Sequence, residues 1–549
     1  MLNKIKKKVR QLQNGIKKSE IQKWQDRFER NKTEYENNLS AMTLRDNMYN
    51  GSDKIMKKDG TYAADSKYTR NIVAEIIEAE VDSSIPLPKV SAKRPEDEEN
   101  AQTIENFLRN ETDFLPFERL NDLDERTTPI QGGNYYLVEW DNTRNTHKTV
   151  GGVKVSLLHP RQVIPQAGVT EIEDMDYIFV MTGVTKEQVK RKFGVDVSYE
   201  SEEFPQARSN AGETQRTADD MVTLVTAYYK NRKGGIGVYR WVGDTEVQNL
   251  DDYFARRLKR CKKCGEVVSE DDTKCKHCGS TKFEYAEEKT TPLTRDIELG
   301  SGEMLNQMLG AEYQDGIKFD ENGEMIFDEM GNPVTEQIMI ADARPNDVPV
   351  YKIKQYPIVL RRNISKNNSL LGISDVDTLK DPQEFIKKVG SKIQEKLLKG
   401  GSYVTFPKGA NIRKTDEELN VIELDSITDK QMIDVINIQP NINNDVMYQE
   451  SVYQSARQLI GITDSFQGRS DRTAQSGAAK QFAAAQAAGR LESKRTMKQA
   501  AYQELYELIF KFMLAFADEP RPTTSRSGLG EIEYGIFDRY NFLERDANG

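Results

Sequence analysis

Apolar side chains recur every three to four positions through the first part of the chain, and this spacing predicts a run of amphipathic helices. The first covers residues 19–49, where Trp24 and Phe28 stand among many charged residues. Three more helices are predicted over residues 68–80, 96–110 and 116–127. The dipeptide Gly132-Gly133 then ends the helical pattern.

Beyond that dipeptide the pattern changes to short alternating segments that are typical of strands. Strands are predicted over residues 134–140, 153–158, 177–181, 222–229 and 237–241. Helices followed by an antiparallel-looking sheet indicate an α+β lobe. A turn-rich, acidic stretch over residues 297–346 interrupts this lobe, so we expect residues 252–346 to form an insertion in it.

The second half of the chain opens with a helix that carries lysines. Asp381 is a suitable N-cap and Pro382 suits the first helical position, so this helix is predicted to run from there to Gly400-Gly401. Its apolar positions form one stripe, made of Phe385, Ile386, Val389, Ile393 and Leu397. Much of the remaining surface is basic, with Lys387, Lys388, Lys392, Lys396 and Lys399. We expect one face to pack and the other to contact solvent.

Short strands, a second helix, a polar loop and a long helix follow in that order. The strands are predicted over residues 402–406, 420–424 and 435–438, the second helix over 443–459 and the long helix over 478–517. The loop over residues 463–477 has a length that usually indicates function or mobility in compact domains. Alanine dominates the first third of the long helix, which gives it high helix propensity and a thin profile.

Composition narrows the classes of function. A net charge of −10 over 549 residues argues against a broad nucleic-acid-binding face, because tight binding neutralises many phosphates with Lys and Arg. It does not exclude a protein through which DNA merely passes. The most apolar helical stretch, residues 508–517, contains Lys511 and is far shorter than the roughly 20 residues that span a bilayer. The basic run near the N-terminus is not followed by an apolar segment, so we expect a soluble protein made inside the cell, with no membrane partner.

The four cysteines of the chain lie in one short window with the spacing C-x2-C-x10-C-x2-C, namely Cys261, Cys264, Cys275 and Cys278. A glycine follows each pair and permits the tight turn that aims two thiolates at one point. Four thiolates form the closed tetrahedral shell of a structural zinc, so a zinc ribbon is predicted over residues 258–285. Two disulfides or a redox C-x-x-C are the alternatives, and the lack of an export signal disfavours disulfides. The many lysines and arginines around the cysteines fit either contact with nucleic acid or simple solubility.

Signatures of common catalytic sites are missing from the sequence. It has three histidines, none in an H-E-x-x-H pair, and no G-x-x-x-x-G-K-[ST] motif. Carboxylates number 88, and nothing in their spacing singles out a pair. We therefore expect a protein that is not an enzyme.

A family resemblance rests on several short segments together with the order of elements in the second half. The segments are Leu44-Arg45 with Met48-Tyr49-Asn50-Gly51, Ile130-Gln131-Gly132-Gly133-Asn134-Tyr135-Tyr136, His159-Pro160 with Val163-Ile164-Pro165, Tyr356-Pro357-Ile358, Asn368-Ser369 and Gly372-Ile373-Ser374. Together they cover most of the chain, and the chain resembles the portal proteins of tailed bacteriophages. The zinc ribbon departs from the general pattern of that family and has the character of an insertion.

The resemblance implies a portal-like α+β fold with an inserted zinc ribbon. The implied parts are a wing lobe (residues 1–365), a first stem helix (366–400), a small β clip (401–440), a second stem helix (441–462), a tunnel loop (463–477), a tunnel helix with the helix that follows it (478–517) and a C-terminal wing or crown segment (518–549).

The family also implies a function without catalysis. About twelve copies of the chain would form a ring at one capsid vertex of the virion, assembled in the host cytoplasm, for packaging and ejection of double-stranded DNA. The implied partners are further copies of the chain, the major capsid protein, the large terminase subunit, a head-completion or adaptor protein, and the passing DNA.

The resemblance assigns DNA-facing positions to the tunnel loop, namely Gln467, Arg469, Ser470, Arg472 and Thr473. Salt bridges between subunits are an equal alternative for the two arginines. Lys387, Lys388, Lys392 and Lys396 of the first stem helix are candidates to line the channel, although solvent contact or pairing between subunits is favoured.

Two functions of other classes remain as alternatives. The first is a zinc-ribbon accessory protein that binds nucleic acid as a monomer or dimer, and the second is an enzyme whose site has no recognisable motif. Oligomeric state separates the portal interpretation from both.

Overall fold

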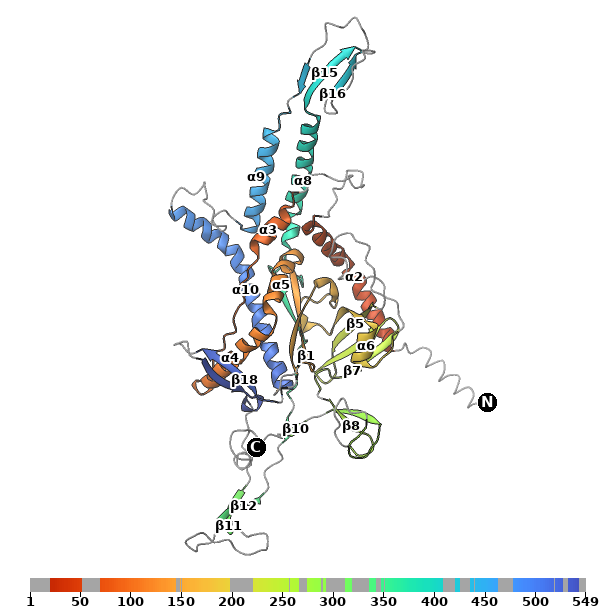
Figure 1. The fold of residues 1–549 in the computed structure, drawn as a ribbon, viewed down its shortest axis with the longest axis vertical. Coiled ribbons are helices and arrows are strands. Elements are labelled where there is room, and N and C mark those ends of the chain that lie inside the picture. The colour runs from red at the N-terminus through yellow and green to blue at the C-terminus, as the bar shows by residue number, and fades with distance from the viewer. Residues whose placement is uncertain are drawn as a thin grey trace, which may run out of the picture.

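The computed structural model describes most of the chain in separate stretches. They are residues 20–51, 70–144, 149, 151–197, 221–255, 257–265, 274–287, 290–292, 312–317, 335–341, 347–349, 351–407, 420–424, 435–438, 440–462, 477–517, 519–526 and 532–542. Helices and mainly antiparallel sheets are combined in these residues, which confirms the α+β class. Figure 1 shows an elongated molecule, with a central body, a two-helix projection at one end and small β units at the other.

The helices and strands lie close to the predicted positions. The helices are α2 (Glu20–Tyr49), α3 (Ile72–Glu80), α4 (Glu98–Phe114), α5 (Phe117–Gln131), α6 (Lys186–Phe193), α8 (Asp375–Lys399), α9 (Asn443–Ile460) and α10 (Gly477–Phe516). The strands of the body are β1 (Gly133–Asp141), β2 (Gly152–Leu158), β3 (Val163–Ile164), β4 (Tyr177–Thr185), β5 (Met221–Lys230), β6 (Ile236–Val242), β7 (Thr245–Leu250) and β14 (Ile358–Arg362). Helix α6 and strands β7 and β14 were not predicted.

A five-stranded sheet, ordered β3-β4-β5-β6-β7, forms one side of the body and is covered by α2. Trp24 and Phe28 of α2 are buried against this sheet and meet the Phe179 ring edge-on, with ring centroids 6.3 and 5.4 Å away. The apolar spacing that predicted α2 is therefore the spacing of its buried face.

A three-stranded sheet, ordered β14-β1-β2, supports the second half of α10. The helix presents Tyr502, Leu505, Ile509 and Phe512 at helical spacing, and all four are almost completely buried. Antiparallel pairing of Gly133 with Arg362 and Leu137 with Ile358 joins segments that are far apart in the sequence.

Gly132 occupies the turn between α5 and β1, and its conformation requires glycine. Its φ is +86°, in the left-handed region, and its carbonyl oxygen accepts hydrogen bonds from the amides of Asn363 (3.1 Å) and Gly372 (2.9 Å). A Cβ atom at this position would lie 2.4 Å from the Gly372 carbonyl oxygen. This close approach fixes the start of β1 against the segment that leads into α8.

The predicted N-cap of the lysine-bearing helix at Asp381 is wrong. Helix α8 begins at Asp375, where the Ser374 hydroxyl accepts a hydrogen bond from the Asp377 amide at 3.4 Å, and Pro382 lies inside the helix. Val376 and Leu379 are completely buried. Their apolar contacts stabilise a helical turn before Pro382, although proline favours the first turn of a helix.

Helices α8 and α9 run side by side and project from the body as a two-helix stem (Figure 1). At the far end of the stem the chain forms a small sheet, ordered β16-β15-β17. Its strands are β15 (Gly401–Pro407), β16 (Asn420–Leu424) and β17 (Val435–Ile438), and β15 pairs parallel to β16 and antiparallel to β17. All three strands were predicted.

Two two-stranded units lie within the predicted insertion of residues 252–346, and a third closes it, because its second strand begins one residue beyond the predicted end. They are β8 (Arg257–Cys261) with β9 (Phe283–Glu287), β11 (Glu312–Ile317) with β12 (Thr335–Ala341), and, as the third, β10 (Thr290–Pro292) with β13 (Asp347–Pro349). Because β10 and β13 pair with each other, the two ends of the segment between them lie side by side.

The C-terminal strands β18 (Arg521–Arg526) and β19 (Ile532–Phe537) form a hairpin that packs on α4. The Phe537 ring stacks on the Phe107 ring of α4 with a centroid distance of 4.1 Å, and both side chains are buried. The C-terminal segment is therefore part of the body core.

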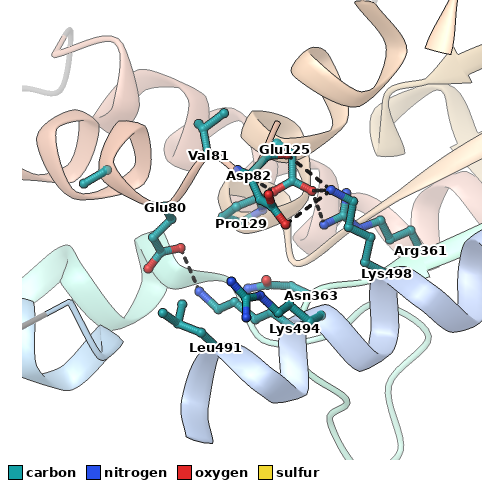
Figure 2. Close-up of a pocket in the computed structure, with 12 residues that line it drawn as sticks. Glu80, Val81, Asp82, Glu125, Pro129, Arg361, Asn363, Leu491, Lys494 and Lys498 are labelled. Atoms are coloured by element: carbon teal, nitrogen blue, oxygen red, sulfur yellow. Dashed lines mark hydrogen bonds and ion pairs between the residues drawn. The ribbon is translucent and has the colours of Figure 1, made fainter. Parts of the chain in front are cut away.

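Charged side chains from four elements meet where the stem joins the body, and Figure 2 shows those from α3, α5 and α10. The Lys494 ammonium of α10 lies 2.8 Å from carboxylate oxygens of both Glu80 of α3 and Asp375 of α8, and both carboxylates are almost fully buried. One turn further along α10, Lys498 lies 3.0 Å from the Glu125 carboxylate of α5. Burial and the nearby Asp375 charge raise the pKa of Glu80 to about 8.

Candidate metal centre and stem surface

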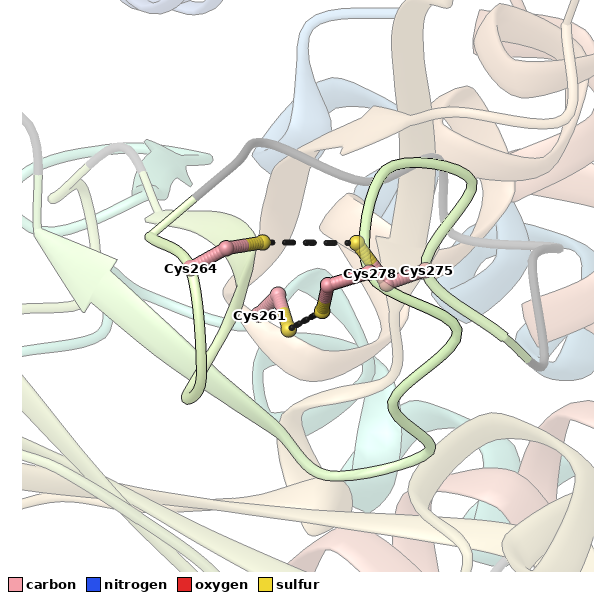
Figure 3. Close-up of side chains that lie close together, drawn as sticks. All are labelled: Cys261, Cys264, Cys275 and Cys278. Atoms are coloured by element: carbon pink, nitrogen blue, oxygen red, sulfur yellow. Dashed lines mark hydrogen bonds between the residues drawn. The ribbon is translucent and has the colours of Figure 1, made fainter.

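The four cysteines come together in the small unit formed by β8 and β9. Their sulfur atoms all lie within 4.8 Å of one another, with 3.4 Å between Cys261 and Cys278 and 3.5 Å between Cys264 and Cys275 (Figure 3). All four are free thiols, so the alternative of two disulfides is not the arrangement found here.

Two glycines shape the turns that carry the cysteines. Gly265 and Gly279 have φ values of +75° and +67°, and their amides donate hydrogen bonds of 2.8 Å to the carbonyls of Cys261 and Cys275. Each turn thus brings the two cysteines of one pair to the same side. This is the local geometry that the sequence predicted.

The cluster has the dimensions of a metal site. Four sulfurs bound at about 2.3 Å to one ion in a tetrahedron lie about 3.8 Å from each other. The observed range, from 3.4 and 3.5 Å for two pairs up to at most 4.8 Å, includes that value. A set of four thiolates suits zinc or an iron–sulfur centre and leaves no position for water. The arrangement is therefore fit to hold a metal ion for structural purposes.

The electrostatics of Cys261 favour the thiolate form that metals bind. Desolvation acts to raise its pKa, but backbone hydrogen bonds from Cys264 and Lys263 outweigh it and lower the pKa to about 6. Cys261 and Cys275 are buried, and with Phe283 they make an apolar cluster of their own. The unit therefore depends on this cluster and its ligands rather than on the main core.

The stem lysines do not share one surface. Lys387 is only 5% exposed, whereas Lys388 and Lys392 are exposed, and Lys388 pairs with Glu384 at 3.2 Å. Lys396 pairs with Asp445 of α9 within the same chain. Only Lys388 and Lys392 of the four thus present largely exposed side chains.

The stem also exposes large apolar side chains, which the sequence pattern did not predict. Leu397, which that pattern placed on the packed face of α8, is among them because the end of the helix projects away from the body (Figure 1). The exposed apolar residues are Leu397 and Leu398 near the end of α8 and Val446, Met447, Tyr448 and Leu459 on α9, and Leu398 and Met447 are more than 70% exposed. We call these six residues the apolar stem surface. A signal was present, because Val446, Met447 and Tyr448 are consecutive, and three consecutive helical positions span too wide an arc for a single packed stripe.

Tunnel-loop candidates Gln467, Arg469, Ser470, Arg472 and Thr473 lie outside the residues that the structure describes. The same holds for the side chains of the Ala-rich start of α10. Within the described residues, no helix is both long and apolar enough to cross a membrane.

Comparisons with known proteins give no family for this chain. No protein-family model matches it, and no curated protein sequence matches it either.

Proposed function

We propose that this chain is one subunit of a portal-like ring that conducts double-stranded DNA through a capsid vertex. The apolar stem surface carries the proposal. Among the described residues, no other element of the same copy covers the large apolar side chains along the two projecting stem helices (Figure 1).

Association of copies removes this surface from water. Full burial of a Leu or Met side chain contributes about 1.5–3 kcal/mol, and each copy offers six large apolar residues on its stem. Large apolar side chains that are exposed together on one element mark interaction sites more often than isolated ones do. A heterologous contact repeated from copy to copy closes into a ring, and a ring of parallel stems encloses a passage.

The charge balance suits a passage for DNA. Strong phosphate contacts would slow sliding, and the chain carries 88 acidic against 78 basic residues. On the described part of the stem, two of the four candidate lysines already pair with carboxylates of the same chain. Such pairing reduces the attraction of the stem for a passing phosphate backbone.

Zinc is the metal that we assign to the four-cysteine cluster, in a structural role. The ribbon is too small to have a sizeable core, and metal binding supplies folding free energy to units of this kind. The chain itself performs no catalysis in this proposal. The stem sheet, at the free end of the projection, is the place where we expect the packaging motor and later an adaptor protein to dock, whereas the capsid protein contacts the body.

The apolar stem surface gives a direct test of assembly. Substitutions Leu398→Asp and Met447→Asp together place two charges on it, and we expect the double variant to remain monomeric where the unmodified chain forms a large ring. Size-exclusion chromatography with light scattering measures the mass of each.

A matched control is available outside the stem. Leu87 and Phe114 are 67% and 72% exposed, close to the exposure of the two stem residues, so the Leu87→Asp/Phe114→Asp variant should still assemble. A chain that elutes as a monomer or dimer without any substitution, and binds DNA, would instead support the accessory-protein alternative.

A further inference from the structure

The zinc-ribbon unit carries a charge opposite to that of the chain as a whole. Its described residues, 257–265 and 274–287, include two acidic side chains, Glu284 and Glu287. Against these stand eight basic residues: Arg257, Lys259, Arg260, Lys262, Lys263, Lys274, Lys276 and Lys282. Four further acidic residues, Glu266, Glu270, Asp271 and Asp272, lie outside the described residues, so residues 257–287 carry eight basic and six acidic side chains. The segment therefore has a small positive formal charge of +2 within a chain whose net charge is −10.

Three of these lysines lie within the two cysteine pairs. Lys262 and Lys263 separate Cys261 from Cys264, and Lys276 follows Cys275, and all three side chains are exposed. Because the four sulfurs lie within 4.8 Å of one another, the two turns that carry these lysines are held close together. A metal ion at the sulfurs would fix this spacing. We call Lys262, Lys263 and Lys276 the knuckle lysines.

The unit stands apart from the rest of the molecule. Figure 1 places β8 beside the body, toward the end of the molecule opposite the stem sheet. Phe254, just before β8, is 1% exposed in the main core, while the ribbon has its own small cluster around Cys261 and Cys275. The ribbon therefore joins the body next to a buried residue and has an apolar cluster separate from the main core.

From this arrangement we propose that the knuckle lysines form a sequence-independent contact site for the phosphate backbone of double-stranded DNA. Exposed ammonium groups recognise phosphates without reading bases. Among the ribbon's aromatic residues with a described side chain, Phe283 is half-buried with the Lys259 ammonium over its face at 4.7 Å, so it is poorly placed to stack on bases. This favours a duplex, whose bases are paired, over a single strand.

Acidic residues of the ribbon set the strength of this contact. Glu284 lies 3.9 Å from Lys262, and both side chains are more than half exposed, so this ion pair is weak and yields readily to a phosphate. Residues 266–273, outside the described residues, include Glu266, Glu270, Asp271 and Asp272. These carboxylates oppose binding of a polyanion, so the site holds DNA loosely, in the range of about 10⁻⁴–10⁻⁶ M that is usual for non-specific contacts.

The location of the site relative to a ring rests on the proposed function. In that setting the ribbons lie on the side of the ring away from the stem sheets, where they would contact DNA beyond the stem. DNA binding by the ribbon itself does not depend on assembly.

The test compares binding of a short fluorescein-labelled DNA duplex to the full chain and to its variants by fluorescence anisotropy over a salt series. For Lys262→Gln/Lys263→Gln/Lys276→Gln we expect affinity at low salt to fall about tenfold or more and the slope of log K against log salt to become shallower by about 2 to 3. In the opposite direction, Glu270→Gln/Asp271→Asn/Asp272→Asn should bind the duplex more tightly. Zinc content measured on each variant reports whether the ribbon is intact.

A matched control removes equal charge elsewhere. Helix α6 carries three exposed basic residues in its last turn, so Lys190→Gln/Arg191→Gln/Lys192→Gln tests for a general charge effect. Unchanged binding by the knuckle variant with its zinc retained, or an equal loss in the α6 variant, would overturn the proposal. The knuckle lysines could instead only offset the negative charge of the metal-bound thiolates. The knuckle variant would then bind zinc less tightly and DNA with unchanged affinity, and this result would also overturn the proposal.

Mass measurement on the same samples separates this inference from the proposed function. If the chain forms rings but the knuckle substitutions leave its DNA affinity unchanged, only the ribbon site is contradicted. If the chain stays monomeric and the knuckle substitutions lower its DNA affinity, only the proposed ring is contradicted.

Discussion

At the scale of single residues, Glu80 couples the stem junction to pH. Its carboxylate is buried beside Asp375 and Lys494, and its pKa is raised from 4.5 to about 8, so the folded chain binds the proton more tightly than the unfolded chain does. The stability from this group is complete below about pH 4.5 and is lost as the pH rises toward 8.

Glu80→Gln imitates the protonated side chain and does not titrate. Because the unmodified chain loses stability as Glu80 ionises, we expect the melting temperature of the variant, relative to that of the unmodified chain, to rise between pH 5 and pH 8.5. Thermal unfolding followed across this range measures the difference. Glu78, on the same helix, has a lowered pKa because Arg126 donates hydrogen bonds to it, so Glu78→Gln should become relatively less stable above the pKa of Glu78. Equal pH profiles for the two variants would show that Glu80 does not hold a proton at the junction.

Gly132 provides a second residue-scale prediction, because two separate constraints act on it. Gly168 has a similar φ of +79° but nothing within 4 Å of a Cβ atom, whereas a Cβ at Gly132 would lie 2.4 Å from the Gly372 carbonyl oxygen. Gly168→Ala should therefore cost only the strain of the left-handed backbone, about 1–2 kcal/mol. Gly132→Ala should cost clearly more in the free energy of unfolding, measured by chemical denaturation, and equal costs would mean that the contact with Gly372 yields easily.

At the scale of elements, the ribbon should be separable from the body. Arg257 pairs with Glu287 at the open end of the β8–β9 ladder, so the two ends of the unit lie side by side. Replacing residues 257–287 by a short Gly-Ser linker should remove the bound zinc and leave the melting temperature of the body almost unchanged.

Deletion of the C-terminal hairpin gives the contrasting result. Phe537 is fully buried against Phe107 in the main core, so loss of β18 and β19 should destabilise the body strongly. Metal analysis and thermal unfolding follow both deletions. A body that unfolds when the ribbon is excised would contradict the separation of the two apolar clusters.

The sequence was most informative where the determinants of an element are local. The four cysteines fall within one window and each pair is followed by glycine, so the clustering of their thiols was predictable from spacing alone. Helices α2 and α10 have regular apolar spacing and lie close to their predicted bounds. The start of α8 was misplaced because buried contacts of Val376 and Leu379 decide it, and no local signal marks these positions as buried.

Features built from distant segments could not be predicted. Pairing of β1 with β14 joins Gly133 to Arg362, and the junction joins Glu80, Asp375 and Lys494, three residues with no pattern in common. Long-range contacts of this kind depend on the packing of the whole body rather than on propensity.

At the scale of the whole molecule, the long axis separates two surfaces of different chemistry. The stem end exposes apolar side chains, and the four-cysteine unit with its exposed knuckle lysines lies toward the opposite end (Figure 1). In the proposed ring the first surface joins copies and the second contacts DNA, so assembly and DNA binding are expected to respond to different substitutions.

The mass of the purified full-length chain in solution tests the central proposal most directly. Mass photometry combined with negative-stain imaging is expected to find annular particles of about 750 kDa, which corresponds to about twelve copies of the 62.7 kDa chain. A chain that remains a compact 62.7 kDa monomer at high concentration, with no annular particles in the images, would contradict it.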